Sequence, residues 1–133
     1  MRLLDHVSIA VRDLERARRF YDAVLSALQV KKVSEKEAAI GYGERNRPHD
    51  DGHTYLSLYR SSTSSADPRR HWCFRAPSAA AVRAFHAAGL AAGGVDAGAP
   101  GLRPNYHAAY YAAFLTDPEG NRVEAVWHQG DDR

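Results

Sequence analysis

Two histidines and a glutamate are the residues of this chain whose types and placement could do chemistry together. His6 and His71 each lie near the start of a segment that alternates polar and apolar residues, and Glu124 lies in a similar segment near the end. Cys73 is the only cysteine, so an internal disulfide and a thiolate zinc cluster are excluded. Imidazole and carboxylate groups are the plentiful metal ligands, so any metal site must be of the nitrogen and oxygen type.

An internal repeat relates the two histidines. In each half the strand pattern runs into a helix N-cap, Asp13 or Ser78, and apolar residues then recur at three- and four-residue steps. Short β-like stretches follow at residues 29–33, 37–42 and 53–60 in the first half, and at 94–97, 109–116 and 121–128 in the second. Each half is therefore expected to form one strand, one helix and three strands. The equivalent positions are His6 and His71, Asp13 and Ser78, Phe20 and Phe85, and Leu25 and Leu90.

Length and composition fit one α+β domain over residues 1–133. The 133 residues include 44% hydrophobic and 26% charged side chains, which lies near the globular average and argues against disorder. A Ser-rich stretch at 61–67 is the expected linker. It divides the domain into a module of residues 1–66 and a module of residues 67–133.

The charge pattern narrows the range of partners. The formal net charge is +2 and the basic residues are scattered, so nucleic acid is not an expected partner. No apolar run approaches the roughly 20 residues of a membrane span, and the first residues lack the apolar core of a signal peptide. We therefore expect a cytoplasmic protein that binds no membrane and takes a small-molecule substrate.

The repeated βαβββ unit carries two recognisable segments, Leu4 to Ile9 at its start and Asp117 to Glu124 at its close. With a histidine early in both opening strands, this arrangement resembles the glyoxalase, bleomycin-resistance and extradiol-dioxygenase superfamily, also called vicinal oxygen chelate proteins. The resemblance covers essentially the whole chain. It implies two tandem βαβββ modules that form curled mixed sheets around a cup-shaped cavity. It also implies a homodimer, with the site either within one chain or shared across two.

Carried over position by position, the resemblance implies that His6, His71 and Glu124 hold one divalent metal ion. Fe, Mn, Ni and Zn are all candidates for that ion. Ser57 stands where glyoxalases and epimerases of the superfamily have Glu, Gln or His. The two-His-one-carboxylate set is instead similar to that of the extradiol dioxygenases and fosfomycin-inactivating transferases. Such a triad leaves coordination positions open for substrate and water.

Strand alternation gives an independent reason to group the same three residues. Because alternate side chains share a face, His6 and His71 are placed away from the helix that must cover the apolar face. In the closing hairpin, a four-residue turn at 117–120 is expected to pair Ala113 with Glu124, which leaves room beside the carboxylate. Tyr111 would then lie diagonal to Glu124 and is a candidate catalytic acid or base.

Four further residues are candidates for substrate binding on the same faces. Arg75, two residues past His71, could clamp an anionic group, and Arg122 also favours an anionic guest. His128 is expected at the rim, about 13 Å along the strand from Glu124. The complete set is Arg75, Tyr55, Ser57 and His128.

These residues favour a small metal-dependent enzyme. Its substrate would carry two adjacent oxygens and chelate the ion, in lyase, isomerase, transferase or ring-cleaving dioxygenase chemistry. A metal-free protein that binds a small molecule or drug, like the bleomycin-resistance members, is the alternative. A third possibility is a protein that keeps the His and Glu residues only as a relic.

Overall fold

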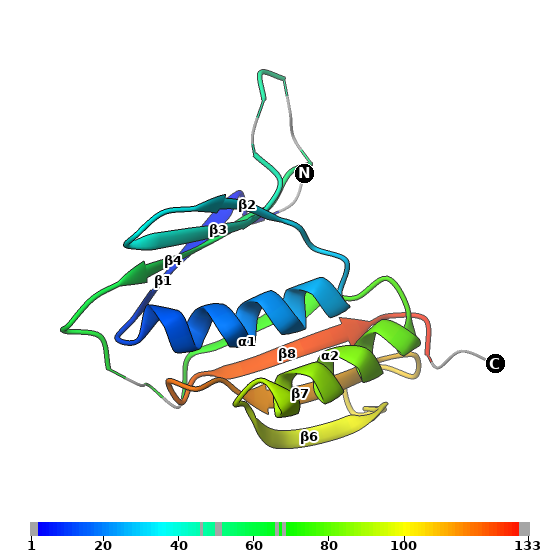
Figure 1. The fold of residues 1–133 in the computed structure, drawn as a ribbon. Coiled ribbons are helices and arrows are strands. Elements are labelled where there is room, and N and C mark those ends of the chain that lie inside the picture. Colours follow the sequence, from blue (N-terminus) through cyan, green and yellow to red (C-terminus); the bar gives the residue numbers. More distant parts are fainter. Residues whose placement is uncertain (1–2, 46, 50–51, 66, 68, 131–133) are drawn as a thin grey trace.

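The computed structural model describes residues 3–45, 47–49, 52–65, 67 and 69–130 and contains two βαβββ modules in tandem (Figure 1). The first module contains β1 (His6–Val11), α1 (Leu14–Ala27), β2 (Lys32–Glu35), β3 (Ala39–Gly43) and β4 (Tyr55–Arg60). The second contains β5 (His71–Arg75), α2 (Ala79–Ala91), β6 (Val95–Leu102), β7 (Tyr111–Thr116) and β8 (Arg122–Trp127). The predicted α+β fold class is confirmed. The expected linker at 61–67 joins the modules, although its residue 66 lies outside the described residues.

Both helices begin at the residues that the sequence predicted. The Asp13 side chain accepts a hydrogen bond from the backbone N–H of Arg16, and Ser78 does the same for Ala81. The apolar face of α1 is buried as the spacing required, at Leu14, Ala17, Phe20, Tyr21, Val24 and Leu25. Neither helix among the described residues is long and apolar enough to span a membrane.

The two modules build sheets of the same topology. Sheet A has the order β1-β4-β3-β2 and sheet B the order β5-β8-β7-β6. In each sheet the first and last strands of the module are parallel neighbours, and the other pairs are antiparallel. Ser8 pairs with Ser57 in sheet A as Cys73 pairs with Glu124 in sheet B. The expected equivalence of Ser57 and Glu124 is therefore confirmed.

The larger of two hydrophobic clusters among the described residues lies between the sheets, and the smaller one, around Phe114, lies on the other face of sheet B. The larger cluster contains both helices and one face of each sheet, with Phe20 of α1 and Phe85 of α2 fully buried. Sheet A lies on one side of the helix pair and sheet B on the other (Figure 1). We call the uncovered face of each sheet its cup face. Because both sheets turn their other face to the same helices, the two cup faces of one chain point in opposite directions.

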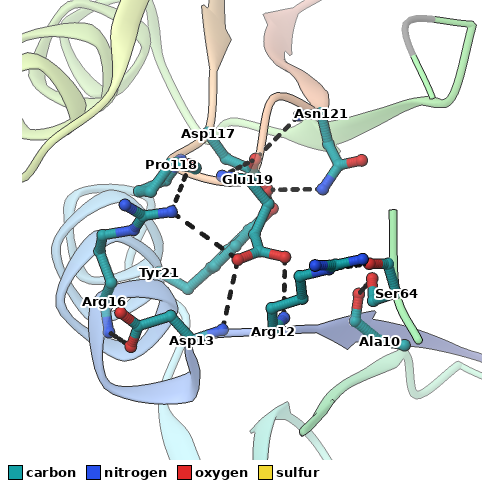
Figure 2. A network of polar contacts seen from close by, with 10 residues as sticks. All are labelled: Ala10, Arg12, Asp13, Arg16, Tyr21, Ser64, Asp117, Pro118, Glu119 and Asn121. Carbon is teal, nitrogen blue, oxygen red and sulfur yellow. Dashed lines mark hydrogen bonds and ion pairs between the residues drawn. The ribbon is translucent and has the colours of Figure 1, made fainter. Parts of the chain in front are cut away.

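A carboxylate in the turn of the second module joins it to the first (Figure 2). Glu119, in the turn between β7 and β8, accepts hydrogen bonds from the backbone N–H groups of Arg12 at 2.8 Å and Asp13 at 3.3 Å. The adjacent Asp117 accepts a hydrogen bond from the buried Tyr21 hydroxyl of α1 at 2.6 Å. The turn of the second module thus binds the start of the helix of the first.

The same turn corrects the expected pairing of the last hairpin. The structure pairs Phe114 with Glu124 and Ala113 with Ala125, one residue away from the predicted register. Pro118, Glu119 and Gly120 form a three-residue loop, in which Gly120 has a φ of 90° and its N–H bonds to the Asp117 carbonyl. This loop is one residue shorter than the four-residue turn that the sequence predicted, and the resulting shift exchanges the two faces of β7 but leaves Glu124 on the cup face.

Candidate functional site

Two of the predicted site residues, His71 and Glu124, are in direct contact on the cup face of sheet B. The parallel neighbours β5 and β8 place His71 beside Glu124, and the His71 Nε2 lies 2.7 Å from the Glu124 Oε1. The Glu124 side chain is 5% exposed, whereas that of His71 is 37% exposed. The pair therefore presents an accessible imidazole in front of a buried carboxylate, and both groups are ordinary ligands of divalent metals.

Tyr110 completes this group and was missed from the sequence. Its hydroxyl donates a hydrogen bond of 2.5 Å to the second carboxylate oxygen of Glu124. Partial burial and this hydrogen bond raise the pKa of Tyr110 well above its usual range, so the hydroxyl remains a donor. The Pro-Glu-Gly sequence of the loop could have predicted this position, because a three-residue loop places Tyr110, and not Tyr111, on the cup face.

The proposed position of Tyr111 next to Glu124 is wrong. Tyr111 belongs to the buried core on the helix side, and its hydroxyl accepts a 3.3 Å hydrogen bond from Arg83 of α2. Phe114 takes the place opposite Glu124, where the sequence analysis expected the small Ala113. The Phe114 ring also meets His71 edge to face, with a centroid distance of 5.9 Å. The carboxylate is therefore more enclosed than expected.

Two histidines form the rim of the same face. The His107 Nε2 lies 3.0 Å from the His128 Nδ1, and the two rings stack with a centroid distance of 5.3 Å. Desolvation, then the charges of Arg75 and His107, lower the pKa of His128. The His128 ring contacts Tyr110 at a centroid distance of 5.4 Å, so this rim reaches the hydroxyl that binds Glu124.

Cys73 pairs with Glu124 along β5 and β8, but its thiol is not activated. Desolvation by the surrounding side chains, and then the negative charge of Glu124, raise the pKa of the thiol well above its usual range. Because the thiolate is the nucleophilic form, the structure offers no support for nucleophilic chemistry at Cys73.

On the side of sheet A, His6 belongs to a different polar group. Its Nδ1 donates to Asp5 at 2.7 Å, and the buried His53 donates its Nε2 hydrogen to the other oxygen of Asp5 at 2.9 Å. The hydrogen bond from His6 contributes most to lowering the pKa of Asp5. Asp5 adjoins His6 in the chain, whereas His53 follows the polar loop after β3, so local pattern alone does not join His53 to the other two.

Tyr55 and Ser57 lie on the cup face of sheet A with His6. Ser57 is only 8% exposed and pairs with Gly41 of β3. A Cβ atom at Gly41 would stand 1.6 Å from the Tyr55 hydroxyl oxygen, so the tyrosine lies across the space that this glycine leaves open. Tyr55 is therefore partly accessible to a ligand on sheet A, whereas Ser57 is buried.

The three predicted metal ligands are not brought together within one chain. His71 and Glu124 touch, whereas His6 lies on the opposite cup face, beyond the two helices. No cluster of three or more His, Cys, Asp or Glu side chains suited to a metal ion occurs among the residues that the structure describes. One chain thus carries two separate groups of candidate ligands, one with His71 and Glu124 and one with His6, and we call these groups half-sites.

Comparison with known proteins places this geometry in a family. The chain belongs to the Glyoxalase/Bleomycin resistance protein/Dioxygenase superfamily, whose family model matches residues 3–125. The resemblance inferred from the sequence is confirmed. No curated protein matches the chain.

Several crystal structures share the fold. A glyoxalase/bleomycin resistance protein from Albidiferax ferrireducens T118 is 29% identical, with a TM-score of 0.77 over 94% of this chain and 98% of that chain. A glyoxalase/bleomycin resistance protein/dioxygenase family enzyme from Burkholderia phytofirmans PsJN is 20% identical, with a TM-score of 0.68 over 92% and 95% of the two chains. A lactoylglutathione lyase from Agrobacterium tumefaciens is 22% identical, with a TM-score of 0.61 over 95% and 93%.

Proposed function

We propose that the protein is a divalent-metal-dependent enzyme of its superfamily that acts on a small substrate with two adjacent oxygens. The observation that carries the proposal is the contact between His71 Nε2 and Glu124 Oε1 at 2.7 Å. These two donor atoms are of the types that divalent metals accept, and they converge on one point of the cup face of sheet B, where the imidazole is accessible. His71, Glu124 and one further histidine would hold the ion, and the ion would supply Lewis-acid activation of a bound oxygen.

The third ligand in this proposal is the partner's His6. Within one chain His6 cannot reach Glu124, because the two lie on cup faces that point in opposite directions. A homodimer in which sheet A of one chain covers sheet B of the other would bring the half-sites together twice. Strands β1 and β5 are both at sheet edges, so each has a side open to another chain.

The residues around Glu124 would then orient and enclose the substrate. Tyr110 holds one carboxylate oxygen and so fixes the direction of the other. Phe114, 8% exposed, forms the apolar wall opposite the carboxylate. The histidines at the rim, His107 and His128, lie where a substrate would enter or leave the cup.

The alternative, a metal-free binding protein, is favoured by a different feature of the same face. His71 and Glu124 already satisfy each other without an ion, and aromatic rings lie beside them. Tyr106 and Tyr110 have ring centroids 4.8 Å apart. Such a surface could take a planar guest by stacking alone.

The metal content of protein purified without chelator distinguishes these functions. We expect close to one divalent ion per chain in the unaltered protein and strong loss in His6→Ala, His71→Ala and Glu124→Ala. His86→Ala is the matched control, because His86 bonds Asp96 on β6 and is remote from both half-sites. A protein that holds no stoichiometric metal after incubation with Fe(II), Mn(II), Ni(II) and Zn(II) would support the metal-free alternative.

Mixing two variants that do not bind metal tests whether the metal site is shared between the two chains of a dimer. When His6→Ala and Glu124→Ala chains are unfolded and refolded together, a mixed dimer keeps one intact site made from the two unaltered half-sites. We expect each mixed dimer to bind one metal ion, whereas a dimer of the unaltered protein binds two. If the mixture binds no more metal than the separate variants, the site is not shared between chains.

A further inference from the structure

We propose that Arg103 and Arg122, which flank Phe114 on the cup face of sheet B, form a subsite for a carboxylate or phosphate group of the substrate. The guanidinium carbon of Arg103 lies 5.4 Å from the centroid of the Phe114 ring, and that of Arg122 lies 5.8 Å from it. Both distances fall within the roughly 6 Å range of cation–π contact. One ring therefore holds two positive groups close to Glu124.

The two arginines reach this ring from different strands. Arg122 begins β8 and is the diagonal neighbour of Phe114, which pairs with Glu124 two residues further along that strand. Arg103 follows the end of β6, on the other side of β7. The two guanidinium groups therefore reach the Phe114 ring from the strands on either side of β7.

Two glycines make room for Arg103. A Cβ atom at Gly98 or at Gly101 would stand 3.2 Å from a guanidinium nitrogen of Arg103. The same guanidinium donates a 2.6 Å hydrogen bond to the carbonyl of Ala99, between these two glycines. The side chain is thus folded back along β6 and held toward the cup.

Neither guanidinium is neutralised among the residues that the structure describes. Among the described residues, the Arg103 guanidinium donates hydrogen bonds only to the carbonyls of Ala99 and Leu102, and the Arg122 guanidinium makes neither a hydrogen bond nor an ion pair. The nearby Glu124 carboxylate is already engaged on both oxygens, by His71 and Tyr110. Two cations near one ring repel each other, and an anion bound between them would relieve that repulsion.

The chemical class of the ligand follows from the groups that would bind it. Guanidinium groups present planar pairs of donors that match the oxygens of carboxylates and phosphates. Phe114 adds an apolar surface beside the anion, so a small organic anion fits better than a free inorganic ion. As a part of an active site the subsite rests on the function proposed above, whereas anion binding itself does not require a metal.

Isothermal titration with inorganic phosphate and with malonate tests the subsite in protein treated with EDTA and then desalted. At low ionic strength we expect Arg103→Gln and Arg122→Gln each to weaken binding at least fivefold, and the double variant to show none. Arg19→Gln is the matched control, because Arg19 is exposed on α1 and its loss changes the net charge equally. Gly101→Ala should weaken binding less than Arg103→Gln, since a Cβ atom 3.2 Å from a guanidinium nitrogen shifts Arg103 slightly without removing a charge.

The outcomes separate this inference from the metal proposal. Binding that is lost in the arginine variants and kept in Arg19→Gln supports the subsite, even if the protein holds no metal. Equal weakening in all three single variants would show a nonspecific charge effect and overturn the proposal. The proposal is also overturned if the folded, unaltered protein binds neither probe, whatever its metal content.

Discussion

The carboxylate of Glu119 accepts the backbone N–H of Arg12 at 2.8 Å, although 107 residues separate the two in sequence. The Glu119 side chain is only 9% exposed and lies 3.8 Å from a guanidinium nitrogen of Arg16 as well. It therefore joins the turn of the second module to the start of α1 in the first (Figure 2). This contact helps to hold the half-sites on opposite faces of one chain.

Glu119→Ala should destabilise the protein by about 1 kcal/mol, because two backbone N–H groups at the start of α1 would lose their acceptor. Urea unfolding followed by circular dichroism measures the change. Glu37→Ala is the control, since Glu37 is exposed and should change the stability by less than about 0.5 kcal/mol. Equal stability of the two variants would show that Glu119 does not join the modules.

Tyr110→Phe and Tyr111→Phe form a matched pair of variants. Loss of the Tyr110 hydroxyl frees one oxygen of Glu124, and loss of such a supporting hydrogen bond lowers metal affinity by about tenfold or more. Tyr111→Phe should leave the affinity unchanged, because that hydroxyl contacts Arg83 on the helix side. Titration with Mn(II) compares them, and the opposite ranking would contradict the observed register of β7.

A site residue could be placed from the sequence when its position depends only on residues of the same strand. It could not be placed when its position depends on a loop or on another strand. The faces of β1, β5 and β8 were predicted correctly, because alternation within a strand places His6, His71 and Glu124 without reference to any neighbour. The exposed and buried faces of β7 were predicted incorrectly, because the register of β7 depends on the length of the loop that joins it to β8. Gly120 at the third loop position indicated a three-residue loop, and that reading would have selected Tyr110.

Other parts of the site could not be predicted by local rules. Arg103 reaches Phe114 only because β6 extends to Leu102, beyond the short strand at 94–97 that the sequence indicated. The strand shifts register against β7 near Gly98 and Gly101, and such irregularities are set by contacts between strands. The separation of His6 from Glu124 likewise follows from the packing of both modules on one helix pair.

Asp96 should make part of the stability depend on acidic pH. A hydrogen bond from His86, and then one from the backbone of Gly98, lower the pKa of Asp96 from 3.8. A carboxyl whose pKa is lower in the folded state stabilises the protein above the unfolded pKa, and that contribution is lost as the pH falls through the folded value. Urea unfolding between about pH 6 and pH 2 should therefore show a smaller acid-dependent loss in Asp96→Asn.

His86→Ala should reduce the same dependence, because it removes the largest cause of the lowered pKa of Asp96. The Asp5 carboxyl also has a lowered pKa, so some acid dependence should persist in both variants. If Asp96→Asn and the unaltered protein lose stability in parallel as the pH falls, the His86 contact does not stabilise the folded carboxylate.

Ser57→Glu tests the half-site of sheet A. Ser57 is equivalent to Glu124 in the repeat and lies on the cup face with His6, but its short neutral hydroxyl is a weak ligand. If the partner's sheet A covers His71 and Glu124, a carboxylate at this position would supply a further ligand. We expect divalent-metal affinity to rise by about tenfold, as an added anionic oxygen ligand tightens binding. Ser57→Leu is the control, because it adds a larger side chain without a ligand oxygen. A folded Ser57→Glu protein with unchanged metal affinity would show that Ser57 does not face the ion, and would contradict the assembly of the site from the two sheets.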